Sequence, residues 1–272
     1  MPESLLLWAA LASYGLAGAL AWAGPGRSAR WPRAQTLAAG ALVAALLLHT
    51  LSLALRWQTL GHGPFTTMHE ILSSNLWSLA LVVMLAWWLV REVRGVLLLA
   101  VPVLLTLGAW MLLADARPGH MPATYATPLL YVHALVGKLF LGLLLVALAL
   151  GLVPLLRRTA WGARRCAGLP AERRLDELAH RFAAYAFVFE TLMLIVGAVW
   201  AQDAWGRYWA WDPLETWAFL TWISFVAALH ARASMKPAPV LFGLWLCGVF
   251  VIAFLTFFGV PFISTVPHKG AV

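Results

Sequence analysis

The eight histidines of this 272-residue sequence are the side chains best suited to chemistry, and they fall into distinct settings. His49 and His230 lie within strongly apolar runs, where an imidazole must find a partner because hydrocarbon offers none. His133 opens another apolar run, and His268 lies near the C-terminus. Neutral imidazole is a common axial ligand of haem iron. An interhelical hydrogen bond, another metal or a proton relay would explain the same placement.

An aromatic segment occupies residues 202–215, where Trp205, Trp209 and Trp211 follow one another closely. Indole rings commonly populate the membrane interface, so an aromatic girdle would account for any single one of them. Here they lie on one connection, and Gly206 permits a sharp bend or a close backbone approach. The segment therefore predicts a flat apolar shelf that would suit a planar, largely apolar ligand.

The end of this segment has the residue order that starts an α-helix. Asp212, Pro213 and Glu215 occupy the N-cap, first and third helical positions. Acidic side chains at the N-cap and third positions accept hydrogen bonds from backbone N–H groups that have no partner within the helix. We therefore predict that Asp212 and Glu215 are caps, with direct contact to a ligand as the alternative.

The elements that must position these groups are membrane-spanning helices. Of the residues, 62% are hydrophobic and 11% are charged, and the mean hydropathy is +0.83. Since about 20 apolar residues cross the hydrocarbon core, the sequence predicts an all-α, polytopic transmembrane helix bundle of about eight spans. One integral membrane domain is expected over residues 1–272. The expected spans are 4–24, 35–55, 71–90, 95–114, 129–155, 183–202, 214–231 and 239–260.

The 19 Lys and Arg residues, with a net charge of +8, indicate the orientation of the chain. They occur in short connections between apolar runs, a pattern typical of membrane topology signals and not of nucleic-acid binding. Most lie on one side of the expected spans, so both termini are predicted to be extracytoplasmic. The basic loop at about 156–182 is then cytoplasmic, and its stretch AERRLDELAHRF predicts a short amphipathic helix.

Other reactive side chains are few. Cys166 and Cys247 form neither a CxxC pair nor a plausible disulfide, so any thiol chemistry must come from a partner. Glu190 and Lys138 lie inside expected spans, and Glu190 is expected to be either protonated or paired because a lone charge in hydrocarbon is costly. A structural pair, with Lys138 as the suggested partner, is the default expectation. The alternative is that the two form the charge relay of a transporter.

The aromatic segment resembles the WWD signature of the cytochrome c assembly family, most of all its CcsA (ResC) branch. The resemblance starts with the run Trp205-Gly-Arg-Tyr-Trp-Ala-Trp-Asp-Pro-Leu-Glu-Thr-Trp and extends over nearly the whole chain. It also includes His49 with Arg56-Trp57, Gly61-His62-Gly63-Pro64, Tyr131-Val132-His133, Leu229-His230-Ala231-Arg232, and Thr256-Phe257-Phe258-Gly259-Val260 before His268.

This resemblance implies a haem-handling subunit of a cytochrome c synthase, a component of a haem lyase in the inner (plasma) membrane. The subunit would receive haem b in the membrane and present it on the extracytoplasmic face for thioether attachment to apocytochrome c. By resemblance, the iron ligands are His133 and His268 at an outer site and His49 and His230 at an inner site. The implied cofactor-binding surface comprises Trp205, Gly206, Trp209, Trp211 and Asp212.

The resemblance also implies partners. They are a CcsB (ResB) type membrane subunit, an apocytochrome c with its CxxCH motif, a thiol-reducing partner and membrane lipid. A HemX-like regulator of haem biosynthesis, which shares the fold, is the alternative function. The expected span boundaries place His49 nearer the outer face than His230, an arrangement that does not suit a single haem held by both.

Overall fold

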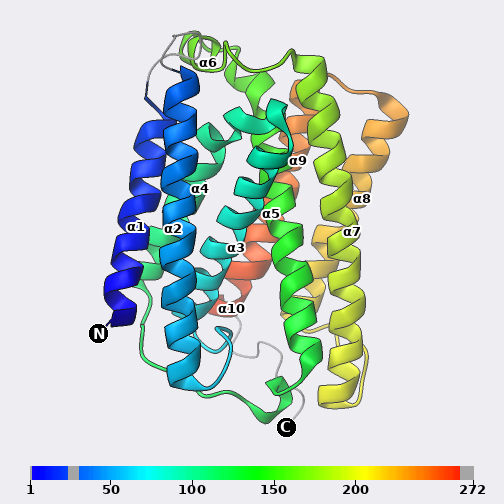
Figure 1. Ribbon diagram of the computed structural model, residues 1–272. Coiled ribbons are helices and arrows are strands. Elements are labelled where there is room, and N and C mark those ends of the chain that lie inside the picture. Colours follow the sequence, from blue (N-terminus) through cyan, green and yellow to red (C-terminus); the bar gives the residue numbers. More distant parts are fainter. Residues whose placement is uncertain (1, 24–30, 264–272) are drawn as a thin grey trace. The chain divides into compact units, whose positions relative to one another are not determined.

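The computed structural model describes residues 2–23 and 31–263 (Figure 1). Within these ranges all regular secondary structure is helical, which confirms the predicted all-α class. Eight segments of the described chain are helical, long and apolar enough to cross a membrane, as the sequence predicts. The chain is a multi-pass membrane protein, and helices suit it because they pair backbone N–H and C=O groups internally where lipid cannot.

The described residues belong to two compact units. Unit 1 takes its residues from Met1–Met121 and Leu156–Pro170, and unit 2 takes its residues from Pro122–Leu155 and Ala171–Val272. The expected single integral membrane domain over residues 1–272 stays a prediction.

Unit 1 is built from long helices that pack side by side. α1 packs against α2 and α4, and α3 packs against α2 and α4; Figure 1 shows α1 and α2 next to each other in blue. Fully buried leucines such as Leu42, Leu76 and Leu104 fill its interior. The elements are α1 (Pro2–Ala21), α2 (Trp31–Leu60), α3 (Met68–Leu89), the 3₁₀-helix η1 (Arg91–Val96), α4 (Leu97–Leu113) and the short α6 (Ala160–Arg165).

A buried ion pair joins the helices of unit 1 at one end. The guanidinium of Arg56 on α2 donates to Glu70 Oε1 on α3 over 3.1 Å, and it lies 3.5 Å from Glu3 on α1. The other carboxyl oxygen of Glu70 accepts from the backbone N–H and the hydroxyl group of Thr66. Because the side chain of Glu70 is almost fully buried, loss of Arg56 alone would leave an uncompensated charge.

Unit 2 contains the aromatic segment. α7 packs against α8 and α9, and α8 packs against α9. Large aromatic side chains, including Phe140, Phe225 and Phe242, are fully buried in it. The elements are the 3₁₀-helix η2 (Ala123–Tyr125), α5 (Pro128–Leu156), α7 (Glu172–Trp205), α8 (Pro213–Met235), α9 (Pro239–Phe254), the π-helix η3 (Leu255–Gly259) and α10 (Val260–Ile263).

One expected boundary is wrong. The sequence predicts a short amphipathic helix in the basic loop, separate from a span at 183–202, but α7 is one continuous helix of 34 residues. Leu175 and Leu178 are both buried, so the predicted apolar side of that stretch exists. The helix continues because no proline interrupts it, and its first glycine, Gly197, is tolerated within a helix.

A pair of glycines allows α5 and α9 to approach each other closely. A Cβ atom added to Gly243 on α9 would overlap with the backbone carbonyl of Gly151 on α5. Backbone atoms cannot move away as a flexible side chain can, so this position of the α5–α9 contact requires glycine.

We therefore predict that Gly243→Ala destabilises unit 2 by about 1–3 kcal/mol, the usual cost of overpacking. The measurement is thermal unfolding of the purified protein in detergent. Gly248→Ala on the same helix is the matched control, because nothing lies within 4 Å of a Cβ atom there. Equal unfolding midpoints for the two variants would contradict the prediction.

Candidate functional site

The aromatic segment begins where α7 ends, at a residue in the left-handed conformation. Gly206 has φ 72° and ψ 16°, and its N–H donates to the carbonyl of Gln202 over 2.9 Å. No atom of the described residues lies within 4 Å of a Cβ atom added to Gly206. Of the two roles that the sequence allows for this glycine, the structure therefore shows the sharp bend and not the close approach.

The segment ends at a capping box that starts α8. Asp212 Oδ1 accepts from the N–H of Glu215 over 2.8 Å, and Glu215 Oε2 accepts from the N–H of Asp212 over 3.4 Å. The same oxygen of Glu215 also accepts from the N–H of Ala210 over 2.7 Å, and Pro213 opens the helix. The predicted caps are confirmed, and these bonds fix the backbone of the segment just before α8.

Four aromatic rings, the loop aromatic group, surround the start of α8. Trp209 and Trp211 meet edge to face, with ring centroids 5.5 Å apart and planes at 83°. Both also contact Phe219, which stacks on Trp222 at a centroid distance of 6.1 Å. The expected single flat shelf is therefore wrong: Trp209 and Trp211 stand nearly at right angles, with the positive edge of one indole facing the negative face of the other.

Two features of the aromatic segment suit a ligand. Trp211, held at φ 56°, leaves 64% of its surface exposed, and Tyr208 leaves 61%. Trp209 carries a buried indole N–H that has no hydrogen-bond partner among the described residues. Buried N–H groups are normally paired. This donor is therefore left unused by the described residues.

His133 lies on α5 against a different set of aromatic rings, the His133 group. Its imidazole is 5.8 Å from the ring of Trp200 on α7, and Trp200 is 5.1 Å from Trp205 and 5.3 Å from Tyr125. The indole N–H of Trp200 donates to the carbonyl of Thr124 over 3.1 Å, which holds η2 against α7. The structure thus brings His133 and Trp205 into one group, with Trp200 between them.

The imidazole of His133 is held in a defined orientation. Its Nδ1 lies 3.0 Å from the carbonyl oxygen of Met193 and donates to it, because a carbonyl can only accept. Gly197 makes this approach possible: a Cβ atom there would lie 2.9 Å from His133 Cε1. A hydrogen bond at Nδ1 places the lone pair on Nε2, the arrangement by which proteins orient metal-ligating histidines.

Tyr125, a member of the His133 group, is affected by the charge of Asp212 at the start of α8. Burial raises the pKa of the Tyr125 hydroxyl, and the negative charge of Asp212 raises it further. The carboxylate that caps α8 therefore lies close enough to η2 to act on the His133 group. Tyr125 remains a neutral hydroxyl across the physiological pH range.

The sequence interpretation missed three residues in or beside the His133 group, namely Gly197, Trp200 and Tyr125. A signal for two of them exists in the sequence. Met193, Gly197 and Trp200 are spaced by four and three residues, so they share one face of α7. A small residue between larger ones on such a face marks a place where a neighbouring side chain can reach the helix backbone.

His49 occupies a different setting, in the interior of unit 1. Its side chain is fully buried, with Nε2 2.9 Å from the hydroxyl of Ser73 and Nδ1 3.3 Å from that of Tyr14. Both ring nitrogens therefore take part in hydrogen bonds between helices, one of the alternatives left open by the sequence. To ligate iron, His49 would have to give up one of these bonds.

Of the remaining predicted ligands, the structure describes His230 in the same unit as the His133 group. His230 lies on α8, where its side chain is exposed, about 27 Å along the helix from Asp212 at 1.5 Å per residue. His49 belongs to unit 1 and His230 to unit 2, so an inner site formed by both stays a prediction. His268 lies outside the described residues.

The expected ion pair of Glu190 is not formed. Glu190 is fully buried on α7, and neither of its carboxyl oxygens has a hydrogen-bond partner among the described residues. The prediction of a pair with Lys138 is therefore wrong. Both residues lie in spans, but the rotation of each helix decides which way a side chain points, and the sequence does not fix that rotation.

Comparison with known proteins gives consistent matches. A family model described as Cytochrome C assembly protein matches residues 3–268. A relative named "Cytochrome c biogenesis protein CcsA" from Prochlorococcus marinus (strain AS9601) is 30% identical over 82% of this chain and 81% of its own length. One with the same name from Panax ginseng is 37% identical over 42% of this chain, a match that spans 36% of the relative.

A solved structure is also similar. A chain named "Cytochrome c Heme Lyase CcmF" matches 94% of this chain with a TM-score of 0.65, and this chain covers 46% of it. At 19% sequence identity the likeness concerns the fold alone.

The capping box gives a direct test of the local structure. We predict that Asp212→Ala accelerates hydrogen exchange of the Glu215 amide by about fivefold, since loss of an N-cap costs about 1 kcal/mol. Asp212→Asn keeps an oxygen at the capping position and is the matched control. The measurement is hydrogen–deuterium exchange with mass spectrometry of peptides that cover 213–220. If Asp212→Ala exchanged no faster than the control, the carboxylate would not be the cap.

Proposed function

The chain belongs to the cytochrome c assembly protein family, and on that premise we propose that it is the haem-handling subunit of a cytochrome c synthase. It receives haem b within the membrane and presents it beside the aromatic segment for attachment to apocytochrome c. The observation that carries this proposal is the oriented imidazole of His133 beside Trp200 and Trp205. A haem is a planar, largely apolar ring system with iron at its centre, so an oriented imidazole beside aromatic rings suits it.

His133 is the proposed ligand of the haem iron on this chain. The Met193 carbonyl fixes its Nδ1 proton, so Nε2 carries the lone pair that a metal needs. His268 is the proposed second ligand, from the other end of the chain. With iron held by two imidazoles, the macrocycle would be fixed at its centre and could not slide along the aromatic surface.

The aromatic segment supplies the remaining proposed contacts. The exposed rings of Trp211 and Tyr208 offer apolar surface, and the N–H of Trp209, which has no hydrogen-bond partner among the described residues, is a proposed donor to a haem carboxylate. Trp205 contributes its ring from the end of α7, and the turn at Gly206 allows the segment to fold back there. Asp212 acts through its cap, which keeps Trp209 and Trp211 in place.

The proposed contribution of the chain to thioether formation is positioning. Addition of a cysteine thiol across a haem vinyl group breaks the S–H bond and the π bond of the vinyl group and forms one C–S bond and one C–H bond, so this step balances without an oxidant. Holding the vinyl group and thiol together converts an encounter of separate molecules into a reaction within one complex, a change that can lower the barrier by several kcal/mol. This role places the chain within a haem lyase, with the covalent chemistry between haem and apocytochrome.

The cellular setting is part of the same proposal. Most Lys and Arg residues fall on the side opposite the aromatic segment, which supports an extracytoplasmic site in the inner membrane with both termini on that face. The proposed partners are a CcsB (ResB) type subunit, an apocytochrome c with CxxCH, and a protein that keeps its thiols reduced. His49 and His230 are proposed for an inner haem site, which His49 could serve only after releasing Ser73 or Tyr14.

The decisive measurement is the absorption spectrum of protein purified from haem-replete cells. We expect a Soret band that falls about tenfold or more in His133→Ala, and that falls also in His268→Ala. Gly197→Ala should weaken it as well, because a Cβ atom there displaces the imidazole of His133. His120→Ala, at an exposed position, should leave the band unchanged. An unchanged Soret band when His133 and His268 are both replaced would overturn the proposal.

Deletion of the chain separates the proposed role from that of a HemX-like regulator. We predict that covalently attached c-type haem disappears while haem precursors stay at normal levels. The measurements are haem staining of denatured membrane proteins and chromatography of the precursors. Altered precursor levels with intact cytochromes c would instead favour the regulator.

A further inference from the structure

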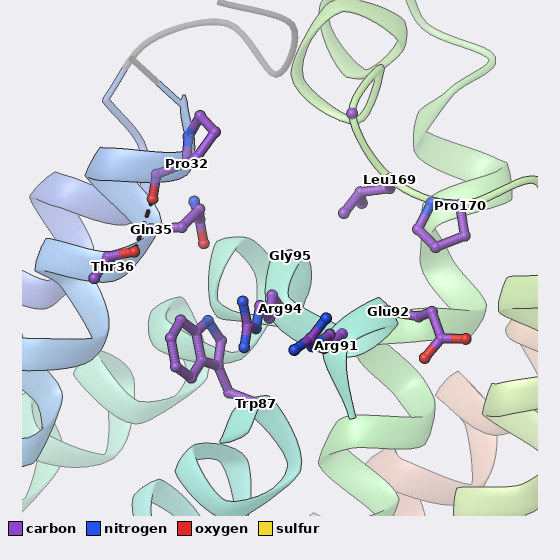
Figure 2. A pocket seen from close by; sticks show the side chains of 11 residues that line it. Pro32, Gln35, Thr36, Trp87, Arg91, Glu92, Arg94, Gly95, Leu169 and Pro170 are labelled. Carbon is purple, nitrogen blue, oxygen red and sulfur yellow. Dashed lines mark hydrogen bonds between the residues drawn. The ribbon is translucent and has the colours of Figure 1, made fainter. Parts of the chain in front are cut away.

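A hollow with a volume of about 390 Å³ lies in unit 1, apart from the aromatic segment. It is bounded by the first turns of α2, by the junction between α3 and η1, and by residues 168–170 (Figure 2). If α2 and α3 cross the bilayer, this place lies at the level of the lipid headgroups, because α2 begins there and α3 ends there.

The wall formed by η1 carries two cationic side chains. Val90 is extended and ends α3, and the 3₁₀-helix Arg91–Val96 follows directly. Arg91 and Arg94 are three residues apart, and side chains at that spacing eclipse one another in a 3₁₀-helix. Both guanidinium groups therefore lie at the same wall of the hollow, and that of Arg94 lies 4.8 Å from the centroid of the Trp87 ring. Figure 2 shows the two beside Trp87.

Two residues that line the hollow each carry a buried polar side-chain atom with no hydrogen-bond partner among the described residues. These atoms are the indole N–H of Trp87, a residue 9% exposed, and the amide oxygen of Gln35, a residue 4% exposed. The amide nitrogen of Gln35 is already used, since it donates to the carbonyl of Ala21 over 3.2 Å. Unpaired atoms of this kind cost free energy, so each one indicates a missing partner: an acceptor for Trp87 and a donor for Gln35.

The opposite wall of the hollow is fixed in place. The guanidinium of Arg157 donates to the carbonyls of Cys166 and Leu169 over 2.9 and 2.8 Å. Leu169 in turn packs against Gly95, where any Cβ atom would overlap with the leucine side chain. The hollow is therefore bounded by bonded and packed elements on both sides.

Charge and hydrogen bonding together define the ligand. The start of α2 adds the positive end of a helix dipole to the two arginines, all of which favour an anion. Glu92, the one acidic residue among the described residues of the lining, extends away from Trp87 in Figure 2. A phosphate group would accept from Trp87 and pair with Arg91 and Arg94, and a hydroxyl on the same ligand would donate to Gln35.

We propose that this hollow binds a phosphate ester that carries a neighbouring hydroxyl, as in the headgroup of an anionic glycerophospholipid. Basic pockets at the ends of membrane helices are a common means of lipid-headgroup recognition. A free phosphate has the same anionic chemistry, so the experiment must separate the two sources. The site is distinct from the proposed haem site and does not depend on it.

The test uses native mass spectrometry of the full chain in neutral detergent, with phosphatidylglycerol or phosphatidylcholine added. We expect one phosphatidylglycerol to be retained at about tenfold lower concentration than phosphatidylcholine. Competition with inorganic phosphate identifies the source: displacement means that the phosphate group alone suffices, and persistence means that the lipid is recognised. Equal retention of the two lipids would overturn the proposal.

Variants of the lining residues test whether the retained lipid lies in the hollow. Arg91→Gln with Arg94→Gln should weaken retention by about tenfold, and Trp87→Phe, which keeps an aromatic ring but loses the N–H, by about threefold. The matched controls are Arg33→Gln with Arg164→Gln, which remove the same charge from exposed positions of unit 1, and Trp88→Phe on the exposed side of α3. If the controls lost as much lipid as the pocket variants, general surface charge would explain the binding and the proposal would fail.

Discussion

The proposed haem site depends on one hydrogen bond, from His133 to the carbonyl of Met193. In a regular helix that carbonyl is already bonded to the N–H four residues later, which here belongs to Gly197. The missing side chain at Gly197 exposes the oxygen, and the second lone pair accepts from the imidazole. The same hydrogen bond therefore joins α5 to α7 and orients the imidazole of His133. Both effects depend on the absence of a side chain at Gly197.

The aromatic segment is held from its two ends. At the first end, Gly206 turns the chain in a left-handed conformation that costs glycine little. At the second end, Asp212 and Glu215 bond the last residues of the segment to the start of α8. Trp211 adopts a positive φ that is unfavourable for its residue type, and it does so directly before the capping box. The rings are exposed, yet the backbone below them is fixed.

Local patterns in the sequence predicted local structure well. The all-α class, the eight spans and the capping box of Asp212 follow from hydropathy and from hydrogen bonding between near neighbours. Relations between helices could not be predicted, because they depend on how each helix is rotated about its axis. Three findings are of this kind: the contact of His133 with Trp200, the near right angle between the rings of Trp209 and Trp211, and the carboxyl group of Glu190, which has no hydrogen-bond partner among the described residues. The continuous α7 was missed because a run of basic residues resembles a loop.

α7 is longer than the hydrocarbon core of a bilayer is thick. Its 34 residues span about 51 Å at 1.5 Å per residue, against about 30 Å of hydrocarbon. Near its first turns, Asp176 is paired with Arg232 of α8, and at its last turn stands Trp205. A rod of this length that tilts by about 5° about its midpoint displaces each tip by about 2 Å, in opposite directions. Because α7 is one continuous helix, a rigid-body tilt of it would move the indole of Trp205 together with the end that carries Asp176.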